Sequence, residues 1–194
     1  MASISGFTRP AERCEGGLSD VWLAASADVS ACVYDRGADA VTDVTLRGGA
    51  AFVRYEFAED TARYRQYVSG DYPKVCVVHE LSFSLARADA HACAALASLT
   101  IAAAQGLVAL VRTASGGAFL AGWSPEFGEE CPLRTASAEV DTRALYDEDS
   151  GALLVLRSRD VSFSKPFTGT LPEDGHDDSV TVTNRYNRIA DGEE

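Results

Sequence analysis

The chain lacks the residue patterns of the common enzyme and metal-binding families. Its three histidines, His79, His91 and His176, stand far apart, and its five cysteines form no C-x-x-C pair. Zinc sites need closely spaced ligands of these types, so we expect no metal site. The G-x-S-x-G, phosphate-loop, dinucleotide-binding and H-E-x-x-H motifs are missing as well. These absences predict a protein that is not an enzyme and that uses no cofactor.

Long apolar segments are also missing. Residues 1–10 have neither the charged start nor the apolar stretch of a signal peptide. The longest apolar stretch, 92–104, is rich in alanine and is interrupted by Ser98 and Thr100, whereas a membrane span needs about 20 strongly apolar residues. We therefore expect no membrane association and reduced cysteines. The cysteines are Cys14, Cys32, Cys76, Cys93 and Cys131.

Positive charge is scarce. The 194 residues include 17 Lys and Arg against 29 Asp and Glu, a net charge of −12. From Leu171 onward there are seven acidic and two basic residues, so this segment carries −5 and the rest of the chain −7. Nucleic-acid-binding surfaces place basic groups against phosphates. The charge balance therefore predicts a surface that repels DNA.

What the sequence does contain is a series of short alternating segments separated by turn residues. We predict strands at 21–25, 30–34, 41–46, 107–113, 118–123, 133–142 and 152–156, the last continuing to 163. Asp89 and Gly106 bracket an alanine-rich segment as N-cap and C-terminal glycine, which predicts a helix over 90–105. The fold class expected is mainly β, an antiparallel β-sandwich or barrel with one packed α-helix and a long β-hairpin. Residues 21–167 would form the single domain, with 1–20 as an N-terminal arm and 168–194 as an acidic, flexible tail.

The most distinctive pattern runs over 51–86, where two long alternating runs flank the turn at 69–73. We interpret it as one long hairpin with an apolar face and a polar face. His79 lies on the apolar face and is expected to be a core or interface histidine. Because an isolated two-stranded ribbon is marginal in water, the hairpin should be covered by the rest of the domain or by a neighbouring subunit. The polar face, the candidate assembly surface, would consist of Arg54, Glu56, Asp60, Glu80, Ser82 and Ser84.

The order of these features, a hairpin at 51–86, a helix at 90–105 and a second hairpin at 107–123, resembles that of phage tail-tube-like proteins. The opening Cys14-Glu15-Gly16-Gly17-Leu18, followed by Val21-Trp22-Leu23-Ala24, is also similar to the start of a group of phage-associated tail proteins. The resemblance implies a structural subunit whose copies close into hexameric rings and stack as a tube. DNA would pass through an acidic lumen without specific binding.

The same resemblance implies further partners and a location. The partners would be other copies of the chain and other tail or baseplate proteins, and the location would be the virion tail after assembly in the host cytoplasm. Two other hypotheses stay open from the sequence. One is an adhesin or carbohydrate-binding module that uses Trp22, Trp123 and loop tyrosines as stacking platforms. The other is an enzyme that uses dispersed carboxylates.

Overall fold

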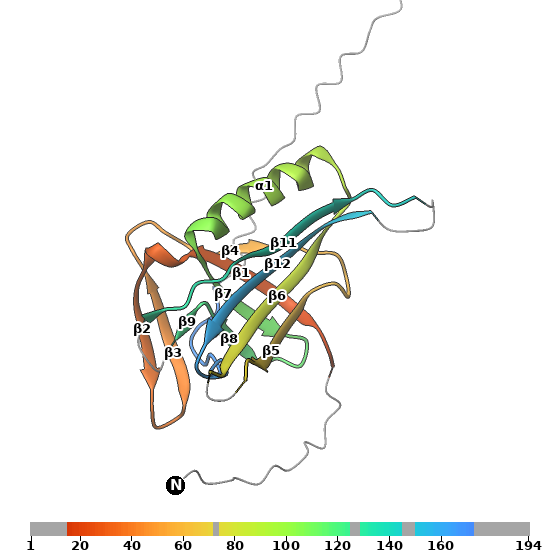
Figure 1. Cartoon of the computed structure of the whole chain (residues 1–194). Coiled ribbons are helices and arrows are strands. Elements are labelled where there is room, and N and C mark those ends of the chain that lie inside the picture. The colour runs from red at the N-terminus through yellow and green to blue at the C-terminus, as the bar shows by residue number, and fades with distance from the viewer. Residues whose placement is uncertain (1–14, 72–73, 125–128, 145–149, 173–194) are drawn as a thin grey trace, which may run out of the picture.

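The computed structural model describes residues 15–71, 74–124, 129–144 and 150–172. The fold is mainly antiparallel β with one α-helix, as expected (Figure 1). The elements are β1 (Leu18–Ala25), a 3-10 turn (Ser26–Asp28), β2 (Val29–Asp35), β3 (Ala40–Leu46), β4 (Val53–Tyr55), β5 (Arg63–Ser69), β6 (Cys76–Ala86), α1 (Ala90–Gln105), β7 (Leu107–Thr113), β8 (Ala118–Ala121), β9 (Trp123–Ser124), β10 (Glu129–Glu130), β11 (Arg134–Asp141) and β12 (Gly151–Asp160).

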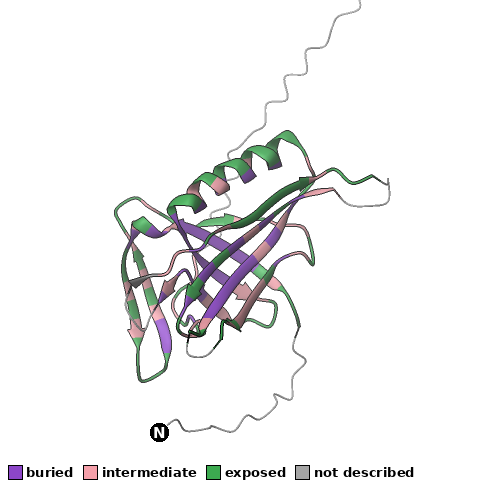
Figure 2. Cartoon of the chain, in the orientation of Figure 1, coloured by how far each residue is buried: buried purple, intermediate pink, exposed green. Residues whose placement is uncertain are grey.

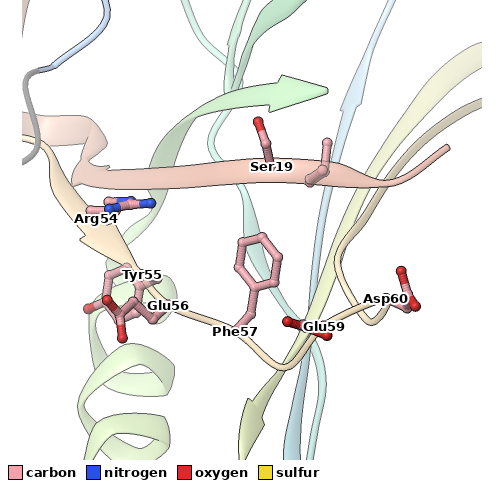
Figure 3. Close-up of a pocket in the computed structure, with 8 residues that line it drawn as sticks. Ser19, Arg54, Tyr55, Glu56, Phe57, Glu59 and Asp60 are labelled. Carbon is pink, nitrogen blue, oxygen red and sulfur yellow. The ribbon is translucent and has the colours of Figure 1, made fainter. Parts of the chain in front are cut away.

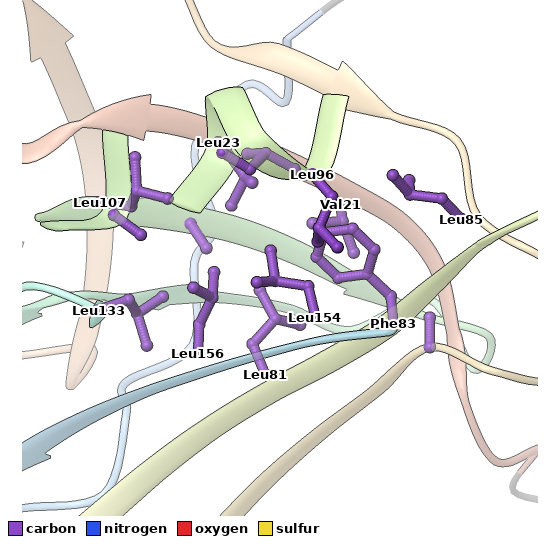
Figure 4. Packing of buried hydrophobic residues seen from close by; sticks show 14 of the residues in the cluster. Val21, Leu23, Leu81, Phe83, Leu85, Leu96, Leu107, Leu133, Leu154 and Leu156 are labelled. Atoms are coloured by element: carbon purple, nitrogen blue, oxygen red, sulfur yellow. The ribbon is translucent and has the colours of Figure 1, made fainter. Parts of the chain in front are cut away.

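Two four-stranded sheets form the body of the molecule. The first sheet has the strand order β4-β1-β7-β8, and the second has the order β11-β12-β6-β5. Apolar side chains from the facing sides of both sheets, among them Val21, Leu81, Phe83 and Leu154, interdigitate in the main core (Figure 4). The two sheets therefore pack as a sandwich, the arrangement that buries one face of each.

The first sheet is covered on both faces. Its central strands β1 and β7 contain almost continuous apolar runs, VWLAA and LVALV, rather than strict alternation. Side chains on the side away from the main core, Trp22, Val108 and Leu110, join a second cluster with Val41 of β3 and Phe167. A strand buried on both faces has no position left for polar side chains, which explains these runs. Figure 2 shows the resulting buried centre.

The helix α1 has the predicted boundaries. The Asp89 carboxylate accepts a hydrogen bond from the Ala92 N–H at 2.8 Å, which satisfies one of the free donors of the first turn. At the other end Gly106 has φ 113°, and a Cβ there would lie 2.6 Å from Cβ of Pro132. Leu96 and Leu99 are buried, and the helix lies beside β11 and β12, where it covers the main core (Figure 1).

The long hairpin differs from the prediction. The strands β5 and β6 do form an antiparallel hairpin, but β4 pairs with β1 in the first sheet, so 51–86 is not one ribbon. The chain turns between the sheets at Asp60, which has φ 58°, and the Thr61 N–H donates to the Ala58 carbonyl. Alternating apolar residues lie on both sides of this turn, Tyr55 and Phe57 before it and Ala62 and Tyr64 after it, which is why the sequence alone suggested an unbroken strand.

The ends of the domain also differ from the expected boundaries. Strand β1 begins at Leu18, inside the segment expected to be an arm, and Asp20 is buried. The Thr168 N–H donates to the Val41 carbonyl at 2.9 Å, and Leu171 packs against the second cluster, so the ordered contacts extend past 167. Residues 1–14 and 173–194, which hold the rest of the predicted arm and tail, lie outside the described residues. Over the described ranges, no helix is long and apolar enough to cross a membrane.

Candidate functional site

The outward face of the second sheet carries a group of arginines. Glu80 of β6 lies opposite Arg65 of β5 and Arg157 of β12. Residues directly opposite in antiparallel strands point to the same side of the sheet, and this side is opposite to that of the buried Leu81. The same strand register places Arg63, Arg134 and Arg159 on this side of the sheet as well. We call the set Arg63, Arg65, Arg134, Arg157 and Arg159 the arginine face.

One carboxylate partly neutralises this face. Glu80 is 9 % exposed, and its Oε1 and Oε2 accept from Arg65 Nη2 at 2.8 Å and from Arg157 Nε at 2.5 Å. The hydrogen bond and the charge of Glu80 raise the pKa of Arg157. The Arg65 guanidinium also lies over the Tyr67 ring, 4.5 Å from its centroid. The five guanidinium groups of the arginine face and the Glu80 carboxylate together carry a charge of +4, and the exposed Glu139 lies farther along β11 on the same side of the sheet.

A pocket of about 360 Å³ opens on this face, with Arg134, Arg157, Arg159 and Tyr67 in its lining. We call it the arginine pocket. Among the described residues, the guanidinium group of Arg159 has no hydrogen-bond or ion-pair partner, and that of Arg134 donates to the carbonyl of Ala104. Planar guanidinium groups bind carboxylates and phosphates in paired hydrogen bonds. The pocket is therefore suited to an anionic group.

A second depression, of about 480 Å³, lies between β1 and the segment 54–60 that joins the two sheets. In Figure 3, Phe57 stands between this segment and β1, with Glu56 on one side and Glu59 and Asp60 on the other. All three acidic side chains are exposed. We call this depression the acidic groove.

The one basic side chain of the acidic groove, Arg54, is tied to a buried carboxylate. Its Nη2 donates to Asp20 Oδ1 at 2.8 Å, while Arg112 Nε donates to Asp20 Oδ2 at 2.7 Å. Burial raises the pKa of Asp20, but hydrogen bonds from Ser19 and Arg112 and the charges of both arginines outweigh it, so the pKa lies below its usual value. Arg54 is therefore held by Asp20 at one side of the groove, where the three exposed carboxylates outnumber it.

The structure separates the six residues predicted as one polar hairpin face. Arg54, Glu56 and Asp60 meet in the acidic groove. Glu80, Ser82 and Ser84 point outward from β6, with Ser82 opposite Arg63. The prediction of a single face is wrong because its two halves belong to different sheets. It also missed the arginine face, although the period-two pattern Arg63-x-Arg65-x-Tyr67 and the pair Arg157-x-Arg159 signal one side of a strand.

No family model, curated protein or solved structure matches the chain. Its function must therefore be inferred from the two charged surfaces and from the open edges of the sheets.

His79 lies in a buried polar cluster, as the prediction of a core or interface histidine requires. It is 2 % exposed, and its Nε2 lies 2.9 Å from the carbonyl of Ser162. Its Nδ1 lies 3.0 Å from the Tyr64 hydroxyl and 2.9 Å from the Ser164 hydroxyl. Burial lowers the pKa of His79 and raises that of Tyr64. We interpret this cluster of neutral groups as a set of hydrogen bonds that fixes 162–164 across the end of the second sheet.

The cysteines and acidic residues offer little metal-binding chemistry. In the part of the chain that the structure describes, no group of three or more His, Cys, Asp or Glu could hold a metal ion. The four described cysteines, Cys32, Cys76, Cys93 and Cys131, are free thiols. Burial and the charge of Asp43 raise the pKa of Cys32 to about 11. This thiol is therefore protonated and unreactive at neutral pH.

Proposed function

We propose that the protein is a structural subunit of a phage or phage-like tail, a tail-tube protein that assembles into stacked hexameric rings. The observation that carries the proposal is the open, exposed outer edge of β11. No described strand pairs with its outer edge, and every residue from Ala136 to Val140 is exposed. Figure 2 shows this strand exposed along most of its length. A strand of this kind is a template for pairing with another chain.

A second uncovered surface supports assembly. Val68 and Val75 of the hairpin end are 55 % and 47 % exposed, and Val161 and Phe163 after β12 are 55 % and 52 % exposed. Val68 of β5 and Asp160 of β12 both pair with Val77 of β6. Val75 lies two residues before Val77, and Val161 and Phe163 follow Asp160, so all four exposed apolar side chains lie at the same end of the second sheet. Apolar groups gathered at one end are typical of a protein contact. We assign this end to contacts with other copies or with other tail or baseplate proteins.

The charge supports the passage of DNA through such a tube. A subunit with a net charge of −12 repels a phosphate backbone, which prevents adhesion during transit. The arginine face would bind DNA if it lined the lumen. In the proposed assembly this face therefore lies away from the lumen, and exposed acidic side chains line it.

The structure gives no support to the carbohydrate-binding alternative. Trp22 is 2 % exposed within the second cluster, and Trp123 packs against the same cluster. A stacking platform needs an exposed ring face, so the two tryptophans named in that hypothesis are placed for packing.

The test is a matched pair of charge insertions. Val140 of β11 is 42 % exposed and Ile101 of α1 is 69 % exposed, so Val140→Lys and Ile101→Lys should both leave the fold intact. A lysine on an edge strand blocks pairing with another strand. We expect wild type and Ile101→Lys to form rings or tubes in negative-stain images at high concentration, and Val140→Lys to stay monomeric in sedimentation velocity. Wild-type protein that stays monomeric at every concentration and salt tested would refute the proposal.

A further inference from the structure

The arginine pocket and the acidic groove lie toward opposite ends of β6. Arg159 of the pocket is opposite Val78. At the other end of the strand, the Ser84 carbonyl accepts a hydrogen bond from the N–H of Ala58, in the segment that forms the groove. Six residues of a strand span about 20 Å. The pocket of one molecule therefore cannot bind the groove of the same molecule.

The two surfaces are complementary in charge and comparable in size. The pocket presents Arg134, Arg157 and Arg159, whereas the groove presents Glu56, Glu59 and Asp60. The cavity volumes are about 360 Å³ and 480 Å³. Each surface also carries aromatic side chains, Tyr67 at the pocket and Tyr55 and Phe57 at the groove. Aromatic and arginine side chains together are common at the centre of protein interfaces.

We propose that the arginine pocket binds the carboxylates of the acidic groove of a second copy, so that subunits join head to tail. This inference rests on the proposed self-assembly and names a contact that would act in addition to the open edge of β11. A contact between two different patches of identical chains closes into a ring when its rotation closes. A symmetric contact of arginine face against arginine face brings like charges together and is disfavoured.

A second copy fits the arginine pocket better than a nucleic acid does. With a local charge of +4 on the arginine face, the rest of the chain carries −16. Because a long polyanion exceeds the length of the patch, it would also meet the net negative charge of the rest of the chain. The acidic groove of a second copy also offers anionic groups, three exposed carboxylates, and its size is comparable to that of the arginine pocket.

The test uses two variants that each disable one partner surface. The pocket variant combines Arg134→Gln with Arg159→Gln, and the groove variant combines Glu56→Gln with Glu59→Gln. All four side chains are exposed. Each variant alone should self-associate at least about tenfold more weakly than wild type, because every head-to-tail contact loses its charge pairs. Mixed in equal amounts, they should associate more strongly than either variant alone, because the intact pocket of the groove variant can bind the intact groove of the pocket variant.

Arg47→Gln and Asp43→Asn serve as controls, because Asp43 is exposed on β3 and Arg47 is exposed directly after that strand, and neither residue lines the pocket or the groove. Sedimentation velocity at low and high salt measures each mixture. If wild type assembles and both variants assemble equally well, the head-to-tail contact is wrong while the proposed function stands. Wild type that never assembles refutes the proposed function itself.

Two further measurements separate other anionic partners. A chain that ends at Pro172 lacks the acidic segment 173–194, and it should assemble like wild type. If this truncation weakens assembly as much as the pocket variant does, the C-terminal segment is the partner and the groove assignment is overturned. Fluorescence anisotropy with a single-stranded oligonucleotide is expected to show no binding that depends on Arg159. Binding that the pocket variant abolishes, with self-association unchanged, would overturn the proposal in favour of a nucleic acid.

Discussion

Replacing Asp20 with alanine should destabilise the fold markedly. The Asp20 side chain is 2 % exposed and accepts hydrogen bonds from Arg54 at 2.8 Å and Arg112 at 2.7 Å. A hydrogen bond to a charged group contributes about 1.5–3 kcal/mol, so the two bonds together represent about 3–6 kcal/mol. The Arg54 and Arg112 side chains are 40 % and 42 % exposed, so water can hydrogen-bond to their guanidinium groups when the carboxylate is removed. We therefore expect a loss of about 2–3 kcal/mol of unfolding free energy, less than the roughly 3–5 kcal/mol lost when a fully buried pair is broken.

Urea unfolding followed by circular dichroism measures this loss, with Asp43→Ala as the matched control. Asp43 is exposed on β3, so its replacement should change the unfolding free energy by less than about 0.5 kcal/mol. The pKa of Asp20 is lowered in the folded state. Its contribution is therefore fully present above the ordinary carboxyl pKa of about 4 and is lost as the pH falls through the lower folded value. Equal effects of Asp20→Ala and Asp43→Ala at pH 7 would refute the conclusion that the hydrogen bonds of Asp20 stabilise the fold.

Two further predictions concern His79 and the glycine after α1. Because burial lowers the pKa of His79, the unfolded chain binds a proton more readily, and stability should fall as the pH drops below about 6.5. In His79→Gln this component of the pH profile should disappear from urea titrations, and an unchanged profile would contradict the neutral cluster. Gly106→Ala should cost more than Gly116→Ala in thermal unfolding, although φ is positive at both, because a Cβ at 106 meets Pro132 at 2.6 Å and one at 116 meets nothing within 4 Å. Gly116→Ala should lose about 1–2 kcal/mol of unfolding free energy from backbone strain alone. Equal losses in Gly106→Ala and Gly116→Ala would show that the contact with Pro132 relaxes freely.

Local signals in the sequence were sufficient for the helix and most strands. The capping hydrogen bonds of Asp89 and Gly106 join groups within four residues along the chain, so these signals can be recognised in the local sequence. The period-two alternation of β6 likewise identified the buried side of that strand, including His79. Capping and alternation are local properties, and the structure confirms both predictions.

The pairing of β4 could not be predicted in this way. Alternation in 53–57 shows that one side of the segment is apolar, but it does not show which strand lies beside it. The partner is β1, about 30 residues earlier in the chain, and the positive φ of Asp60 ends the segment before β5 begins. Aspartate adopts this backbone region without glycine's obvious signal, so nothing in the sequence marked the turn. The error moved Arg54 and Glu56 onto the wrong sheet.

The arginine face was hidden by the net charge of the chain. A charge of −12 describes the whole surface, whereas an interface depends on which side chains the register brings together. Arg65 and Arg157 are 92 positions apart, yet both lie beside Glu80 because β6 pairs with β5 on one side and with β12 on the other. An acidic protein can therefore carry a basic interface. In the proposed tube this segregation has two consequences: acidic side chains are left for the lumen, and the scarce positive charge is placed where one subunit meets the next.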